Sequence, residues 1–238
     1  MSGKEKLASI LKCEFVERNS EGNSSVAFYV DKDHEILYSD LSRFKSKLYI
    51  SAGMINAFFS LMDATFLGDA KASINASQSN MRSVRFGESS LWTHYISNEY
   101  YPSDKLKKLL HFKSCKQFFF PINVKNNHWI LACIDWEKNL IHIYDPLDKT
   151  YPAEMMILLK RINALLGNSH SMGTNHHFKE NIERQFDGHS CAFFACWYAH
   201  QLAAERSISV WMEKQWSTEI ETISENVVIS LIEKKIML

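Results

Sequence analysis

Apolar and polar positions along the chain first predict a β-hairpin. His128–Asp135 has the composition of a strand, Trp136–Asn139 that of a turn, and Leu140–Asp145 that of the returning strand. Another apolar segment, Phe118–Val124, precedes the hairpin. We therefore expect a strand that leads into a tight antiparallel pair.

Helical spacing of apolar residues is strongest in three other segments. Residues 49–62 are strongly apolar, and Ser51 is the expected N-cap. Residues 154–166 are amphipathic, and residues 191–204 contain no Gly or Pro and repeat apolar side chains on one face. Shorter helices are expected in residues 4–16, 91–101, 103–111 and 210–238.

Three segments lack a helical repeat. Residues 25–30 are β-rich, whereas residues 32–47 are polar and mixed. Residues 68–90 are rich in Ser, Asn, Ala and Gly, and we interpret them as a surface loop or a flexible insertion.

Composition excludes several classes of protein. The 238 residues include 27 Lys+Arg and 27 Asp+Glu, so the chain lacks the basic charge that bulk nucleic-acid binding needs. No apolar run approaches 18 residues, and the first residues have no hydrophobic signal core. Five cysteines without a CxxC pair indicate free thiols in a reducing compartment rather than a zinc site.

Cys191 is the strongest candidate for a reactive residue. It follows the turn-like pair Asp187-Gly188 and begins a predicted helix. Unpaired N–H groups and the helix dipole favour negative charge there, and the thiolate is the nucleophilic form of cysteine. Alone, such a cysteine would more often be a small buried apolar residue.

Partners for this thiol are present elsewhere. The predicted hairpin brings His128 close to Asp145, whereas Asp135 lies at the turn end, away from His128. His128 is the candidate base and Asp145 the residue that orients it. Gln185, six residues before Cys191, can place a side-chain amide beside the thiolate as an oxyanion donor, with a backbone N–H as the second donor.

The same residues carry a family resemblance that extends from about Tyr49 to Ala204. The chain resembles the ubiquitin-like-protein-specific cysteine proteases, the Ulp/SENP family, including the separations of 17 residues between His128 and Asp145 and six between Gln185 and Cys191. Four segments match in order: YISAGMIN at 49–56, FFPIN with HWILACID at 119–135, IYDPL at 143–147, and QFDGHSCAFFAC at 185–196.

This resemblance implies an α+β fold with a central mixed β-sheet flanked by helices. We expect residues 1–48 to form an N-terminal extension, a short helix and a β-hairpin, packed on the catalytic domain. Residues 49–205 would be that domain, and residues 206–238 a helical segment of it. The implied activity is cleavage after the C-terminal Gly-Gly of ubiquitin or a ubiquitin-like protein, without a cofactor. An acetyltransferase with the same triad and a non-catalytic binding module remain as alternatives.

Departures from the family pattern concern the substrate. Tyr49 replaces the Trp that covers the Gly-Gly tail, and Ser190 replaces the Asp before the nucleophile. We assign Tyr49, Trp129 and Ser190 to substrate binding. Ala52 and Gly53 replace an acidic pair that contributes to modifier binding, which narrowly favours ubiquitin over SUMO. Residues 68–90 would become ordered by the modifier.

The expected partners are thus ubiquitin or a ubiquitin-like protein of the SUMO or NEDD8 type and its conjugates. We expect a monomer without a membrane span, located in the cytoplasm or nucleus, or in a host cell if the protein is a secreted effector. The pair His176-His177 has no suitably spaced carboxylate or Cys, so we expect no metal site.

Overall fold

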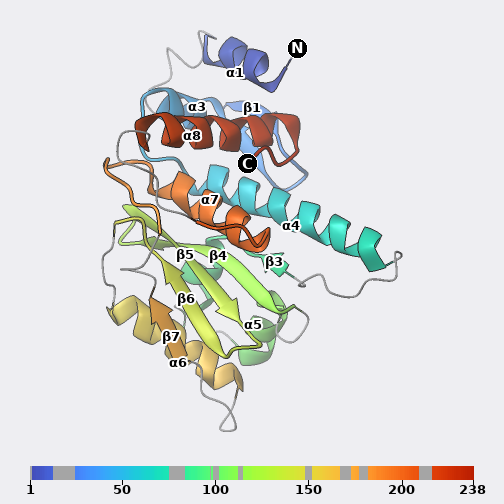
Figure 1. The fold of residues 1–238 in the computed structure, drawn as a ribbon, viewed down its shortest axis with the longest axis vertical. Coiled ribbons are helices and arrows are strands. Elements are labelled where there is room, and N and C mark those ends of the chain that lie inside the picture. Colours follow the sequence, from blue (N-terminus) through green and yellow to red (C-terminus); the bar gives the residue numbers. More distant parts are fainter. Residues whose placement is uncertain are drawn as a thin grey trace.

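A computed structural model gives the architecture of the chain (Figure 1). It describes residues 2–12, 25–74, 84–96, 98, 102–111, 115–147, 152–166, 173–176, 182–208 and 216–238.

A five-stranded mixed sheet forms the centre of the structure. Its order is β3 (Val84–Phe86), β4 (Gln117–Val124), β5 (His128–Asp135), β6 (Leu140–Tyr144) and β7 (Gly173–His176). The three middle strands are antiparallel, whereas β3 and β7 pair in parallel with β4 and β6. The predicted hairpin and the strand before it are confirmed.

Strand β5 divides two hydrophobic cores. Trp129, Leu131 and Cys133 belong to one core, and Ile130, Ala132 and Ile134 belong to the other. Successive side chains of a strand point to opposite faces, so a strand covered on both faces is apolar throughout. All eight residues of β5 are buried.

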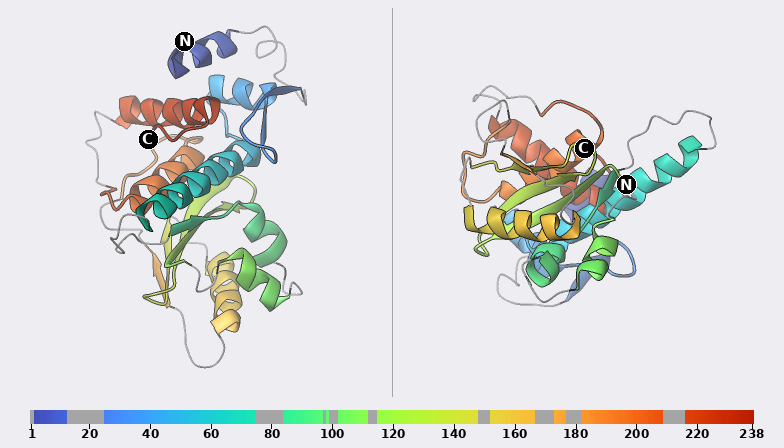
Figure 2. Two further views of the ribbon diagram at one scale, coloured as in Figure 1. Left: turned by 90° about the vertical axis from the view of Figure 1, so that its right-hand side faces the viewer. Right: turned by 90° about the horizontal axis from the view of Figure 1, so that it is seen from below.

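Helices cover both faces of the sheet (Figure 1). The larger core lies under α4 (Ala52–Ile74), α7 (Cys191–Ala203) and α8 (Trp216–Glu233). The smaller core lies under η1 (Leu91–Ile96), α5 (Ser103–Leu109) and α6 (Pro152–Leu166), which are seen below the sheet in the right view of Figure 2. The expected α+β class with a mixed, helix-flanked sheet is confirmed.

Further elements lie on the side of α4 and α7 away from the sheet, beside α8 and beyond it (Figures 1 and 2). They are α1 (Gly3–Leu11), α3 (Tyr38–Lys45) and the antiparallel pair β1 (Val26–Tyr29) and β2 (Glu35–Leu37). Helix α1 packs on α8, and Leu7 of α1 joins the larger core.

Residues 68–90 differ from the predicted loop. Helix α4 continues through Ile74, and residues 84–86 form β3, so the expectation that a partner orders this whole stretch is wrong. A bidentate ion pair between Arg85 and Asp63, with both distances 2.8 Å, fastens β3 to α4. Gly87 lies so close to Leu91 and Phe118 that a Cβ there would lie 2.2 Å and 2.6 Å from their side-chain carbons. Residues 75–83 lie outside the described part.

Two other short elements, α3 and β7, were also not predicted. Residues 38–45, within the stretch interpreted as polar and mixed, form α3, where Leu41 is fully buried. Residues 173–176 form the edge strand β7. In the described part of the chain, no helix is long and apolar enough to cross a membrane.

Candidate active site

Cys191 is the first residue of α7, as predicted, and is fully buried. The carbonyl of Ser190 accepts hydrogen bonds from the backbone N–H groups of Phe193 and Phe194, at 2.9 and 3.1 Å, and so begins the helix. Helix α7 packs on β5, which places its first turn beside the start of that strand.

The environment of the Cys191 sulfur opposes ionisation of the isolated thiol. Burial raises its pKa to about 11, although the backbone N–H groups of Trp129 and Ala192 hydrogen-bond to the sulfur and lower the pKa. The negative charge of Asp187 raises it further. The expectation that the helix terminus would favour the thiolate is therefore wrong for the unassisted thiol, because desolvation is the larger effect.

His128 and Asp145 form the predicted pair. Nε2 of His128 lies 2.6 Å from Oδ1 of Asp145, and both side chains are buried. The same oxygen accepts the backbone N–H of Leu147 at 2.8 Å, which fixes the carboxylate. Since an ionised carboxylate only accepts hydrogen bonds, it places a proton on Nε2 and leaves Nδ1 as the basic nitrogen.

The register of the hairpin explains this contact. Its last pairs are Ala132 with Ile143 and Leu131 with Tyr144, so the strands separate just before Asp145. Strand β5 continues to His128, paired there only with β4, while Asp145 turns toward His128. Asp135 lies at the opposite end, where it accepts hydrogen bonds from Gln117 Nε2 and the Lys138 N–H at 3.0 and 2.9 Å. Of the two candidate acids, Asp145 is therefore the one that contacts His128, and its role as the orienting acid stays a prediction.

Gln185 is held beside this pair by its neighbours. Its backbone N–H donates to the carbonyl of Pro146 at 2.8 Å, which joins the segment of Gln185 to the residue after Asp145. Its side-chain Nε2 donates to the carbonyl of Asp187 at 2.7 Å. An amide nitrogen carries two protons, so a second donor remains on Nε2. The hydroxyl of Tyr198 in α7 donates to the carbonyl of Glu183 and fastens the same segment to the helix.

The three residues assigned to substrate binding lie in different environments. Tyr49 precedes α4 and is 41% exposed. The Trp129 side chain is 3% exposed and packs in the larger core. The contact of Trp129 with the Cys191 sulfur is made by its backbone N–H group. Ser190 is buried, and its hydroxyl donates to Oδ1 of Asp187 at 2.8 Å.

A pocket of about 440 Å³ adjoins the turn before Cys191. Its apolar lining includes Leu48 and Phe193, and its polar lining includes His189, Ser190 and Glu221. Leu48, which lines this pocket, directly precedes Tyr49 in the chain.

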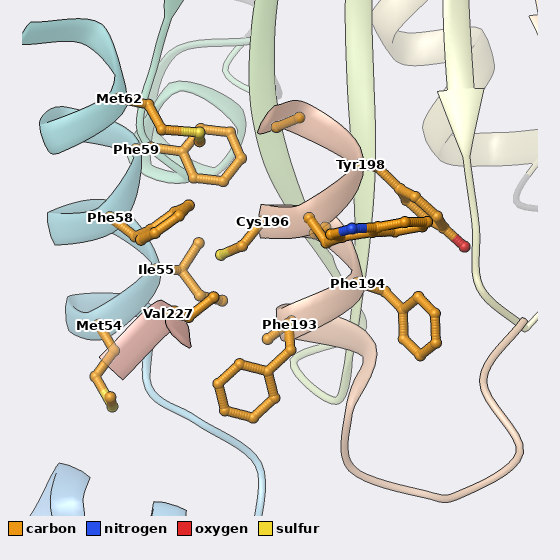
Figure 3. Close-up of a cluster of buried hydrophobic side chains, with 14 of the residues drawn as sticks. Met54, Ile55, Phe58, Phe59, Met62, Phe193, Phe194, Cys196, Tyr198 and Val227 are labelled. Carbon is orange, nitrogen blue, oxygen red and sulfur yellow. The ribbon is translucent and has the colours of Figure 1, made fainter. Parts of the chain in front are cut away.

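Two other thiol and imidazole side chains of the described residues lie apart from the site. Cys196 points from α7 toward Ile55 and Phe58 of α4 (Figure 3), and burial raises its pKa far above the usual range. His142 stacks on Tyr144 with ring centroids 6.3 Å apart. Within the described part of the chain, no three His, Cys, Asp or Glu residues are grouped for a metal. His177 lies outside that part, as do the side-chain contacts of His176.

Sequence reasoning missed what the backbone contributes. The Trp129 N–H at the sulfur and the Pro146 carbonyl at Gln185 leave no signature in residue type. The role of the Asp187 carboxylate was also missed, although the Asp-Gly pair signalled a turn at this position.

A thiol at a helix terminus, an imidazole–carboxylate pair and a primary amide are the kinds of group with which cysteine hydrolases work. Residues 36–234 match the Ulp1 protease family, C-terminal catalytic domain. The chain therefore belongs to the Ulp1 protease family and is a cysteine protease, so the predicted family and enzyme class are confirmed.

Solved structures share the fold. The C-terminal Ulp1 protease domain, solved in complex with SMT3, the yeast ortholog of SUMO, is 14% identical, with a TM-score of 0.66 over 98% of this chain and 94% of that one. The catalytic domain of the Ulp1-like SUMO protease of Chaetomium thermophilum is 15% identical, with a TM-score of 0.58 over 90% and 88%. Comparison with curated proteins gave no match.

Proposed function

We propose that the protein is a thiol isopeptidase that cleaves after the C-terminal Gly-Gly of ubiquitin or a ubiquitin-like protein. The observation that carries this proposal is the 2.6 Å contact between His128 and Asp145. The backbone N–H group of Trp129, the residue after His128, hydrogen-bonds to the Cys191 sulfur. Base and nucleophile thus belong to adjacent parts of one site, and family membership supplies the substrate class.

In the proposed reaction, Nδ1 of His128 takes the proton of the Cys191 thiol, and Asp145 stabilises the resulting imidazolium. The thiolate attacks the carbonyl carbon of the terminal glycine. As the C–N bond breaks, the imidazolium returns its proton to the leaving amine. Water then hydrolyses the thioester, with His128 again as the base, and releases the glycine carboxylate and the free thiol.

Charge that develops on the carbonyl oxygen needs donors in place. We assign this role to the second proton on Gln185 Nε2 and to a backbone N–H at the start of α7. The first proton on that nitrogen is already bonded to the Asp187 carbonyl, which fixes the amide plane. Tyr49, the only exposed member of the substrate-binding set, would cover the narrow Gly-Gly tail.

The modifier is the finer part of the proposal. Ala52 and Gly53 begin α4 next to Tyr49, where the related proteases carry acidic residues, and we retain the narrow preference for ubiquitin over SUMO. The four described cysteines are free, which supports a reducing, intracellular location.

Probes made of ubiquitin or SUMO with a C-terminal electrophile test the proposal directly. We expect covalent labelling of Cys191, faster with ubiquitin, and no labelling of Cys191→Ala. Cys196→Ala is the matched control on the same helix and should be labelled at the wild-type rate. Labelling that survives in Cys191→Ala would contradict the assigned nucleophile, and faster labelling by SUMO would contradict the assigned modifier.

A further inference from the structure

The carboxylate of Asp187 is the centre of the turn that leads into Cys191. Its Oδ1 accepts the backbone N–H groups of His189 and Ser190, both at 2.9 Å, and the hydroxyl of Ser190 at 2.8 Å. The Ser190 carbonyl then begins α7. The position of the nucleophile therefore depends on a turn that one side chain holds closed.

Asp187 also contacts the second part of the site. Its backbone carbonyl is the acceptor for Nε2 of Gln185, at 2.7 Å. Asp187 thus binds the side-chain amide of Gln185 through its backbone carbonyl. Its carboxylate holds the turn before Cys191. Oε1 of Gln185 is buried and has no hydrogen-bond partner, so the contact with Asp187 is the one that sets the orientation of this amide.

We propose that Asp187 is a positioning residue: its carboxylate closes the turn that carries the Cys191 thiol, and its backbone carbonyl, in the same turn, orients the Gln185 amide. This inference rests on the proposed function, because it assigns a role in that reaction. Asp187 touches no reacting atom. It acts through hydrogen bonds that a neutral amide oxygen can also accept, so its negative charge is separable from its positioning role.

That charge has an effect of its own on the thiol. The Asp187 carboxylate raises the pKa of Cys191, because a second negative charge nearby disfavours the thiolate. Other titratable groups also face this region. His128 approaches from β5, and the His189 ring lies 3.5 Å from Oδ2 of Asp187. Lys47, before α4, is paired at 2.8 Å with Glu221 of α8.

Two substitutions separate positioning from charge. Asp187→Asn keeps an oxygen acceptor for the turn and removes the charge, whereas Asp187→Ala removes both. We expect Asp187→Asn to keep kcat within about threefold and to shift the pH profile of Cys191 alkylation by iodoacetamide to lower pH. Asp187→Ala should lower kcat at least tenfold with little change in KM, because the donors and the thiol lose their alignment.

Asp135→Asn is the matched control, since Asp135 also accepts a turn N–H but lies at the far end of β5. It should change neither kcat nor the alkylation profile. The proposal is overturned if Asp187→Ala keeps kcat within twofold of wild type, or if Asp187→Asn loses as much activity as Asp187→Ala. Alkylation needs no modifier substrate, so an unshifted profile in folded Asp187→Asn refutes the charge effect even if the proposed activity is wrong.

Discussion

At the scale of single residues, the reactivity of Cys191 comes from its partners rather than from its place on a helix. Burial raises the thiol pKa to about 11, and the backbone N–H groups around the sulfur offset only part of that increase. At pH 7, a thiol with this pKa and no base to assist it is a thiolate in only about 10⁻⁴ of the molecules. Proton transfer to His128 is therefore required for attack near neutral pH.

Replacing the base should expose the intrinsic pKa of the thiol. In His128→Ala we expect alkylation of Cys191 to be slow at pH 7 and to rise about tenfold per pH unit toward a midpoint near 11. The wild-type protein should react at neutral pH, because the imidazole accepts the proton. Iodoacetamide rates measured from pH 6 upward check this, and a His128→Ala profile equal to that of wild type would contradict the role of His128.

Asp145 should control the tautomer of the base. Asp145→Asn replaces an oxygen 2.6 Å from Nε2 and removes the charge that stabilises the imidazolium, so we expect kcat to fall by about 10³–10⁴. Asp135→Asn should alter kcat less than threefold. Steady-state hydrolysis of a ubiquitin C-terminal ester measures both variants, and equal losses in the two would refute the assignment.

At the scale of elements, α7 has two different ends. Its first residue carries the nucleophile, and its last turn buries His200 against Phe66, with ring centroids 6.1 Å apart. Burial, with a smaller effect of Arg206, lowers the pKa of His200 to about 4. Its ring nitrogen Nδ1 is buried without a partner. The His200 side chain is therefore a neutral imidazole, buried between α7 and α4, at physiological pH.

Acid should weaken α7 through His200. The unfolded imidazole binds a proton near pH 6.5 and the folded one only near 4, so the unfolded state gains protons first as pH falls. The contribution of His200 to the free energy of unfolding is fully present above about pH 6.5. It decreases by on the order of 3 kcal/mol as the pH falls to 4. His200→Leu should lose less stability than wild type between pH 7 and 5.

Urea unfolding at the two pH values measures this difference. His94→Gln, a change at an exposed histidine of η1, is the control and should keep the wild-type pH dependence. If His200→Leu and wild type lose equal stability on acidification, His200 is not the responsible group.

At the scale of the whole molecule, the N-terminal helix α1 packs on α8 through a close contact at Gly3. A Cβ at Gly3 of α1 would lie 2.5 Å from Cγ2 of Ile229 in α8. An ion pair between Lys6 and Glu233, 2.9 Å apart, joins the same two helices. A surface pair of this kind contributes little, so the fit at Gly3 and the burial of Leu7 carry the contact.

Gly3→Val should separate α1 from α8. We expect the free energy of unfolding to fall by about 1–3 kcal/mol, because the added side chain overlaps Ile229. Gly68→Ala is the matched control: nothing lies within 4 Å of a Cβ at this position in α4, and Ala favours a helix by about 1 kcal/mol. Thermal unfolding should show a lower Tm for the first and a higher Tm for the second, and unchanged stability of Gly3→Val would contradict the close contact.

Strands of the central sheet whose contacts are local in sequence were predicted from the sequence, and those that depend on contacts distant in sequence were not. The hairpin of β5 and β6 was predictable because strand composition and its turn lie within one short stretch, and the proximity of His128 to Asp145 followed from it. The short strands β3 and β7 were not, because their parallel partners β4 and β6 lie about thirty residues away in sequence. The depressed ionisation of Cys191 was missed because desolvation depends on packing that no local pattern reports.

The order of the active-site residues along the chain has a consequence for biosynthesis. His128 and Asp145 come from a local hairpin, whereas Cys191 follows 46 residues after Asp145, and α8 closes over the larger core later still. Local hairpins form in microseconds, while contacts distant in sequence form more slowly. On the ribosome, the base and its orienting acid can thus pair long before the nucleophile emerges. A nascent chain would carry no assembled site until Cys191 and α8 had been translated.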